Sequence, residues 1–210
     1  MKKILMGIAL LASLGLASAQ TKRSPQEVMA RAEQQIYSKG DSEATFVSTL
    51  LDAKGKEQGR YNGKIFLQGE NFRLEYGDII AVFSGKTLTH HDDLEETLTI
   101  STPTNEELLQ VNPFHFLRAR GKGFSVRDLG AAGTVQTLAY TPQGKSNIKL
   151  VTIAYNHTTG LPTSIVVLSK DNSRVQIALG SFRNISKPFA KSFFSLTSKD
   201  FPKSEVVDLR

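Results

Sequence analysis

The chain has 210 residues, of which 40% are hydrophobic and 22% charged, and this balance favours one folded domain with a sizeable core over a disordered chain. It contains no cysteine, which excludes disulfide frameworks, thiolate nucleophiles and cysteine-ligated zinc or iron–sulfur sites. The formal net charge is +6, but the basic residues are scattered and not interleaved with aromatics, so we expect no nucleic-acid binding.

The first residues have the pattern of a secretory signal peptide. Lys2 and Lys3 precede an apolar run at 4–16, and Ala17-Ser18-Ala19 is a small-residue cleavage motif. The apolar run is too short for a membrane-spanning helix. We therefore predict a signal peptide over 1–19, cleavage after Ala19, and a single exported domain over 20–210.

The mature chain opens with one amphipathic helix, predicted over 25–38. Ser24 is a suitable N-cap, Pro25 suits the first helical position, and Glu27 completes a capping box. Four apolar residues fall at helical spacing and predict the buried stripe: Val28, Met29, Ala32 and Ile36.

After this helix the hydrophobic period changes to two, which predicts a succession of β-strands. The first strands are expected at 45–51, 61–68, 72–76 and 79–83, and alternation from Leu88 through Leu94 and Glu96 to Ile100 continues the meander. Later strands are expected at 124–129, 135–141, 147–155, 163–169, 174–180 and 193–196. Between the two groups, Thr104 and Glu107 form a second capping box, and Asn112-Pro113 breaks the helix that follows. The pattern predicts a mainly β (α+β) domain, a large curved antiparallel sheet or open barrel covered by two helical segments.

The residues that carry chemistry do not assemble into a catalytic or metal site. There is no nucleophile elbow and no glycine-rich phosphate loop. His90-His91-Asp92-Asp93 is the densest group of potential metal ligands, but in a strand its members point alternately to opposite faces. A surface turn is therefore the better interpretation of this segment than a metal site.

Large apolar residues gather on one face of the predicted sheet. Phe72, Leu74 and Tyr76 share a face, while Arg73 and Glu75 occupy the other. Two short helices give limited cover for ten or more strands, so this face encloses either a plain packed core or an apolar hollow. Periodicity alone does not separate these alternatives.

The order of these segments resembles the LolA family of periplasmic lipoprotein carriers. The resemblance rests on GKIFL at 63–67, NFRLEY at 71–76 and SGKTL at 84–88, in that order and spacing. TGLP at 159–162, the pair Phe193-Phe194 and the closing VVDLR at 206–210 are similar to forms of the family from the Bacteroidetes.

The resemblance implies an unclosed antiparallel β-barrel of about eleven strands with helices over a hydrophobic cavity, and it implies no enzyme activity, no metal and no cofactor. It implies a periplasmic carrier, expected to be a monomer, that shields the acyl chains of lipoproteins and moves them from inner to outer membrane. Its partners would be acylated lipoproteins, an inner-membrane lipoprotein-releasing complex and an outer-membrane acceptor. A sensor of envelope stress or a lipid-binding domain with the same fold is the alternative, and a hydrolase is disfavoured because no catalytic constellation is present.

Shared strand parity then assigns the residues of the predicted site. The cavity-lining residues are Ile65, Leu67, Phe72, Leu74, Tyr76, Phe83, Leu98 and Ile100, and the lid residues beside the Pro113 break are Phe114, Phe116 and Leu117. The family often carries a basic residue followed by proline in the turn after the first long strands, and that arginine is tied to lid closure and release. Here the turn reads Gln68-Gly69-Glu70-Asn71 without either residue, which leaves Arg60 and Arg73 as candidate substitutes.

Overall fold

The computed structural model of the protein describes residues 23–112, 114–118 and 121–210. The predicted signal peptide at 1–19 and the predicted helix break at Pro113 lie outside these residues. No helix within the described ranges is both long and apolar enough to cross a bilayer.

Twelve strands form one open sheet, whose spatial order is β12-β6-β5-β4-β3-β2-β1-β11-β10-β9-β8-β7. Its edge strands, β12 and β7, do not pair with each other, so the barrel is unclosed. All neighbours pair antiparallel except β12, which runs parallel to β6. The predicted mainly β, unclosed architecture is confirmed, with one parallel edge strand that the periodicity did not indicate. The strands are β1 (Ser42–Leu51), β2 (Glu57–Gln68), β3 (Asn71–Tyr76), β4 (Ile79–Ser84), β5 (Thr87–Asp92), β6 (Thr97–Ser101), β7 (Phe124–Ala132), β8 (Val135–Pro142), β9 (Ile148–Asn156), β10 (Pro162–Ser169), β11 (Arg174–Asn184) and β12 (Glu205–Asp208).

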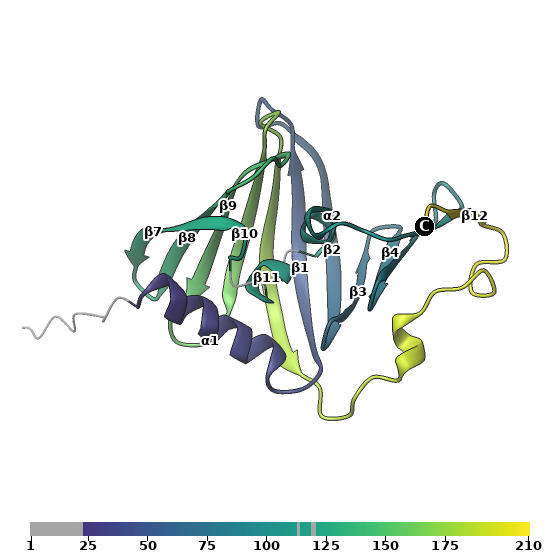
Figure 1. Ribbon diagram of the computed structural model, residues 1–210, viewed down its shortest axis with the longest axis horizontal. Helices are drawn as coiled ribbons and strands as arrows, with labels where there is room; N and C mark the ends of the chain where they lie inside the picture. The colour runs from purple at the N-terminus through teal and green to yellow at the C-terminus, as the bar shows by residue number, and fades with distance from the viewer. Residues whose placement is uncertain (1–22, 113, 119–120) are drawn as a thin grey trace, which may run out of the picture.

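Three helices cover one face of this sheet, which we call the inner face: α1 (Pro25–Tyr37), α2 (Asn105–Val111) and α3 (His115–Arg118). Figure 1 shows α1 running along one end of the sheet across β7 to β11, with α2 over β1 and β2. Both predicted capping boxes are present: Ser24 and Glu27 exchange bonds at the start of α1, and Thr104 and Glu107 do so at the start of α2. These caps satisfy amides that the first helical turn leaves unpaired.

The inner face holds the main core. The four residues predicted for the stripe of α1 are all buried, and they belong to the same core as inner-face side chains of the sheet such as Ile65, Phe72 and Leu138. One close approach depends on a glycine. The ring of Phe46 lies over Gly63 on the neighbouring strand, where a Cβ atom would come within 2.2 Å of the ring. Phe46 therefore fills the space that a side chain at position 63 would occupy.

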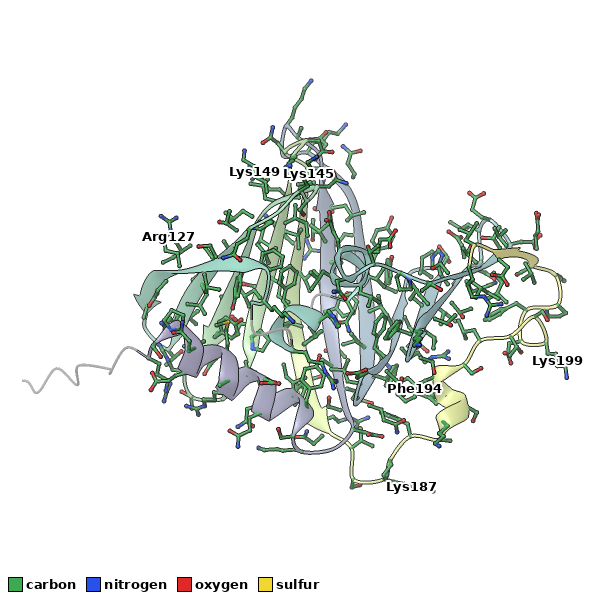
Figure 2. All side chains as sticks on the ribbon, viewed as in Figure 1. Arg127, Lys145, Lys149, Lys187, Phe194 and Lys199 are labelled. Atoms are coloured by element: carbon green, nitrogen blue, oxygen red, sulfur yellow. The ribbon has the colours of Figure 1, made fainter. Side chains whose placement is uncertain are left out.

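The opposite, outer face is partly covered by the segment at 185–204, which we call the C-terminal strap. It leaves β11, crosses to the far edge of the sheet and leads into β12 (Figure 1). Its central turn is a 3-10 helix, η1 (Lys191–Phe194), in which Phe194 is buried (Figure 2). The strand predicted at 193–196 is therefore wrong. The rings of Phe193 and Phe194 meet at 90°, and Phe66 packs edge-on against Phe193, so a helical turn places both rings in one aromatic cluster.

The β5–β6 hairpin changes which residues share a face. Residues 93–96 form a turn, so Leu94 and Glu96 do not continue the strand, and Leu94 is exposed. Asp92 pairs with Thr97, which places odd-numbered residues of β6 beside even-numbered residues of β5. The prediction that Leu98 and Ile100 share a face with Phe72 is consequently wrong. Leu98 lies on the outer face, buried with Val82, Phe194 and Leu196.

Candidate functional site

An apolar cavity of about 270 Å³ lies between the inner face of the sheet and the helices. We call it the inner cavity. Strands β1, β2, β3 and β11 supply its floor and walls, and Val111 of α2 with Phe114, the residue before α3, supplies its roof. Its lining residues are Phe46, Ser48, Leu50, Tyr61, Ile65, Leu74, Tyr76, Val111, Phe114, Val175 and Ile177. Ligand pockets in proteins are about 300–1,000 Å³, so the inner cavity is slightly smaller than this range with the helices in place.

Exposure along the lining shows where the inner cavity opens. At its deep end Ile65 is fully buried and Leu74 is 4% exposed. At the other end Leu50 and Val175 are half-buried, and Tyr61 is 37% exposed. Leu50 and Val175 are paired across β1 and β11, close to the ends of those strands. The mouth of the inner cavity therefore lies beside the β1–β2 and β10–β11 hairpin turns.

The predicted lining residues fall into three groups. Three of them, Ile65, Leu74 and Tyr76, are at the inner cavity. Leu67, Phe72 and Phe83 belong to the same face but are packed in the adjoining core, where Phe72 and Phe83 stack at 5.7 Å between ring centroids. Leu98 and Ile100 lie on the other side of the sheet, as described above.

Sequence reasoning did not identify the walls contributed by β1 and β11. Phe46, Ser48 and Leu50 alternate along β1, and Val175 and Ile177 do so along β11. The alternation is visible in the sequence, but it does not reveal that strands so distant along the chain are neighbours. The β1–β11 pairing brings them together.

The roof residues pack closely over the sheet. Phe114 is 3% exposed and its backbone carbonyl accepts a hydrogen bond of 3.2 Å from the Tyr37 hydroxyl of α1. Phe116 is buried against Phe124 and Tyr140, at 5.0 and 6.2 Å between ring centroids. Leu117 is in α3, and its side chain is outside the described part of the structure. Phe114 thus borders the inner cavity, whereas Phe116 anchors the roof beside β7 and β8.

Arg118 joins the roof to the turn between β2 and β3. Its guanidinium donates to the backbone carbonyl of Gly69 and lies 3.3 Å from the Glu70 carboxylate. The same group sits 5.3 Å from the centre of the Tyr37 ring, within the range of a cation–π contact. The two candidate substitutes do not occupy this position. Arg73 is on the outer face, paired with Glu75 at 2.6 Å and set over the Phe193 ring. Arg60 is exposed near the opposite end of β2.

Burial sets the protonation of several groups near the helices. It raises the pKa of Tyr76 above its usual range, so this phenol at the inner cavity remains neutral. Burial, and then the nearby Arg118 charge, lower the pKa of His115 in α3. In the core, burial raises the pKa of Tyr140 to about 12, and its hydroxyl is 2.6 Å from that of Tyr155. The lining residues of the inner cavity that the structure describes include no carboxylate, lysine, arginine or histidine, so the cavity walls are uncharged at neutral pH.

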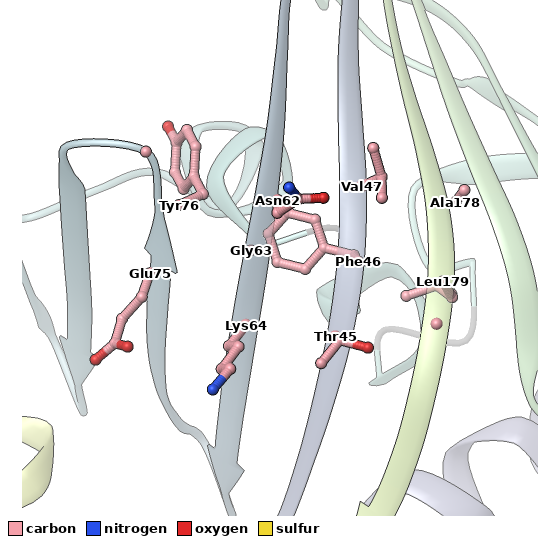
Figure 3. Close-up of a pocket in the computed structure, with 12 residues that line it drawn as sticks. Thr45, Phe46, Val47, Asn62, Gly63, Lys64, Glu75, Tyr76, Ala178 and Leu179 are labelled. Carbon is pink, nitrogen blue, oxygen red and sulfur yellow. The ribbon is translucent and has the colours of Figure 1, made fainter.

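A second depression, which we call the outer groove, lies on the other face of the sheet. It has a volume of about 560 Å³, and Figure 3 shows Thr45, Lys64 and Glu75 among the side chains around it. The surface is recessed at β11 because Ala178 and Gly180 are small residues. The outer groove is open to solvent and carries charge, so it is less suited to hydrocarbon than the inner cavity.

The histidine–aspartate segment does not form a ligand set. His90 pairs across the strands with Ala81, and His91 pairs with Ile80, so the two imidazoles point to opposite faces. His91 stacks on Phe201 of the C-terminal strap at 3.6 Å between ring centroids and bonds to Ser204. Within the described ranges, no group of three or more potential ligands is placed to hold a metal ion.

No protein-family model matches the chain, and no curated protein matches its sequence. Solved structures do share its fold. An uncharacterized conserved protein from Thermus thermophilus superposes with a TM-score of 0.58 at 16% identity, over 89% of this chain and 99% of that one. A DUF1329 family protein from Desulfovibrio piger gives 0.51 at 9% identity, over 81% and 95%. A LolA superfamily protein from Nitrosomonas europaea gives 0.49 at 11% identity, over 83% and 99%. The protein shares its overall fold with the Thermus and Desulfovibrio proteins.

Proposed function

We propose that this protein is a periplasmic carrier that shelters the acyl chains of lipoproteins in the inner cavity and moves them from the inner to the outer membrane. The observation that carries the proposal is an apolar, uncharged cavity with a buried floor, a helical roof and one exposed mouth. The resemblance of the sequence to the LolA family supports the same reading. The predicted signal peptide, with cleavage after Ala19, would export the carrier to the compartment that it would serve.

The physical basis is transfer of hydrocarbon out of water. Each buried methylene contributes about 0.8 kcal/mol, so even a partly inserted acyl chain is held firmly while its polar end stays outside. Neutral walls bind hydrocarbon without a desolvated charge to oppose it. Because the inner cavity is small with the roof in place, a longer chain needs the roof to move outward. Binding and release are then coupled to displacement of α2 and α3, and the carrier needs no catalytic step.

The first experiment asks what occupies the inner cavity. The mature protein, purified without denaturant, is extracted with organic solvent and the extract analysed by mass spectrometry, followed by titration with a fluorescent fatty acid. We expect co-purified acyl lipid and saturable binding with one site. Absence of both would overturn the proposal.

A second experiment separates a carrier from a sensor of the same fold. The purified protein is added to inner-membrane vesicles that contain a labelled acylated lipoprotein, and the label is followed into the supernatant. A carrier removes the lipoprotein in proportion to its own concentration. Depletion of the protein in cells should cause lipoproteins to accumulate in the inner membrane. Acyl binding without lipoprotein release in either experiment would favour the sensor.

A further inference from the structure

Three hairpin turns meet at one end of the sheet, and they carry an excess of basic side chains. They are the β1–β2 turn at 52–56, the β8–β9 loop at 143–147 and the β10–β11 turn at 170–173. The strand register brings them together, because Leu51 pairs with Arg174 and Ser169 pairs with Ile148. We call the turns with their flanking residues the hairpin tips.

Seven basic side chains of the hairpin tips are exposed: Lys54, Lys56, Arg60, Lys145, Lys149, Lys170 and Arg174. No ion pair between described residues involves any of them. The same segments hold three carboxylates, and two of these are engaged within their own turns. Asp52 accepts the backbone N–H groups of Lys54 and Lys56 at 2.9 Å, and Asp171 accepts the backbone and hydroxyl of Ser173. The hairpin tips therefore present a positive surface to solvent.

Two further carboxylates approach this surface from α2. Glu106 and Glu107 line a shallow depression together with Lys145 and Lys170. Glu106 accepts the backbone N–H of Asn147 at 2.8 Å, and Glu107 is held by the capping box. Both carboxylates are thus bonded to the helix start or to the β8–β9 loop. Basic side chains still outnumber carboxylates at the hairpin tips.

The positive surface borders the mouth of the inner cavity. Val175 follows Arg174 directly, Tyr61 follows Arg60, and Leu50 lies two residues before Asp52. These three neighbours are among the more exposed members of the cavity lining. The mouth is apolar, has a tyrosine at its rim and is surrounded by lysines and arginines. A bilayer surface offers the matching groups, because anionic headgroups lie above its hydrocarbon.

We propose that the hairpin tips dock this protein on an anionic phospholipid surface, with the mouth of the inner cavity facing the headgroups. The occupant is the bilayer itself, because its anionic headgroups complement the basic side chains while its hydrocarbon complements the mouth beside them. Docking of this kind brings the mouth close to acyl chains, and it goes beyond the binding of cargo in solution.

The test is co-sedimentation of the mature protein with vesicles of phosphatidylcholine alone or with 30% phosphatidylglycerol (about a third anionic lipid, enough to give a strongly negative surface). The tip variant combines Lys54→Gln, Lys145→Gln and Lys170→Gln, one substitution from each hairpin. The control variant removes the same charge elsewhere, through Arg127→Gln, Lys187→Gln and Lys199→Gln. Figure 2 shows these three control residues distributed around the molecule, away from Lys145 and Lys149.

We expect binding to anionic vesicles only, and weaker binding as salt is raised. Each basic side chain near such a surface contributes about fivefold, so the tip variant should lose affinity by on the order of 100-fold, whereas the control variant should stay close to wild type. Fatty-acid titration in solution should be unchanged in the tip variant, which separates this inference from the proposed carrier function. Three results would each overturn it: no binding to anionic vesicles, wild-type binding by the tip variant, or an equal loss in the control variant.

Discussion

Arg118 is predicted to hold the roof shut, and Arg118→Met tests this because methionine keeps an unbranched apolar stem without the charge. The wild-type guanidinium bonds to the Gly69 carbonyl, faces Glu70 at 3.3 Å and lies over the Tyr37 ring. A hydrogen bond from a charged donor contributes about 1.5–3 kcal/mol, and a cation–π contact about 0.5–1 kcal/mol. Glu70 is 70% exposed, so its ion pair contributes no more than about 0.5 kcal/mol.

The Arg118 side chain is itself 33% exposed, which places the total near the lower end of these values, at about 2 kcal/mol. Loss of that stabilisation should raise the population of the open roof about 30-fold. Native-state hydrogen exchange measures this directly, as faster exchange of the amides of α2 and α3 with unchanged exchange in β9. Glu70→Gln is the matched control and should change exchange by less than about threefold. Unaltered protection of α2 and α3 in Arg118→Met would refute the argument.

Three other variants, one of them with a matched control, test the cavity mouth, the outer face and the protonation of the roof. Val175→Trp should fill the mouth and weaken fatty-acid binding by at least about tenfold, whereas Gln176→Trp, on the other face of the same strand, should leave the titration unchanged. Leu98→Ala should lower the free energy of unfolding, measured in urea, by about 2–5 kcal/mol and speed proteolysis of the strap at 185–204, while fatty-acid affinity is retained. Weakened fatty-acid affinity would contradict the placement of Leu98 on the outer face. Because burial lowers the folded pKa of His115, the neutral form is favoured and stability falls as pH drops below the ordinary value of about 6.5. Roof opening should therefore increase on acidification, and His115→Gln should flatten that pH profile in hydrogen exchange; an unchanged slope would contradict this.

Local rules explain why some elements could be predicted closely. The start of α1 is defined by Ser24 and Glu27, which bond to each other over three residues and need no distant partner. The alternation of Phe72, Arg73 and Leu74 fixes which side of β3 is apolar, because successive side chains of a strand point to opposite faces. Both features depend only on residues a few positions apart in the chain, and both are present in the structure.

The wrong predictions concern residues whose face of the sheet depends on a turn or on contacts with a distant part of the chain. Which residues of β6 share a face with those of β5 depends on the length of the turn between the two strands. This turn has four residues, and the resulting register places Leu98 on the outer face. The aromatic pair at 193–194 has strand-like composition, but its conformation follows from the outer face on which it packs. Arg118 gave no signal as a residue of the site, because its partners lie about fifty positions earlier in the chain.

By itself the sequence determined the helix caps, the strand alternation and the apolar character of one face, since each depends on interactions between near neighbours. Only the tertiary structure decided that β1 and β11 lie side by side, which brings Phe46, Leu50 and Val175 around one hollow. It also decided where that hollow opens and which arginine holds its roof. The reason is that a cavity is the space left between side chains of distant segments, and no local pattern specifies what fills it.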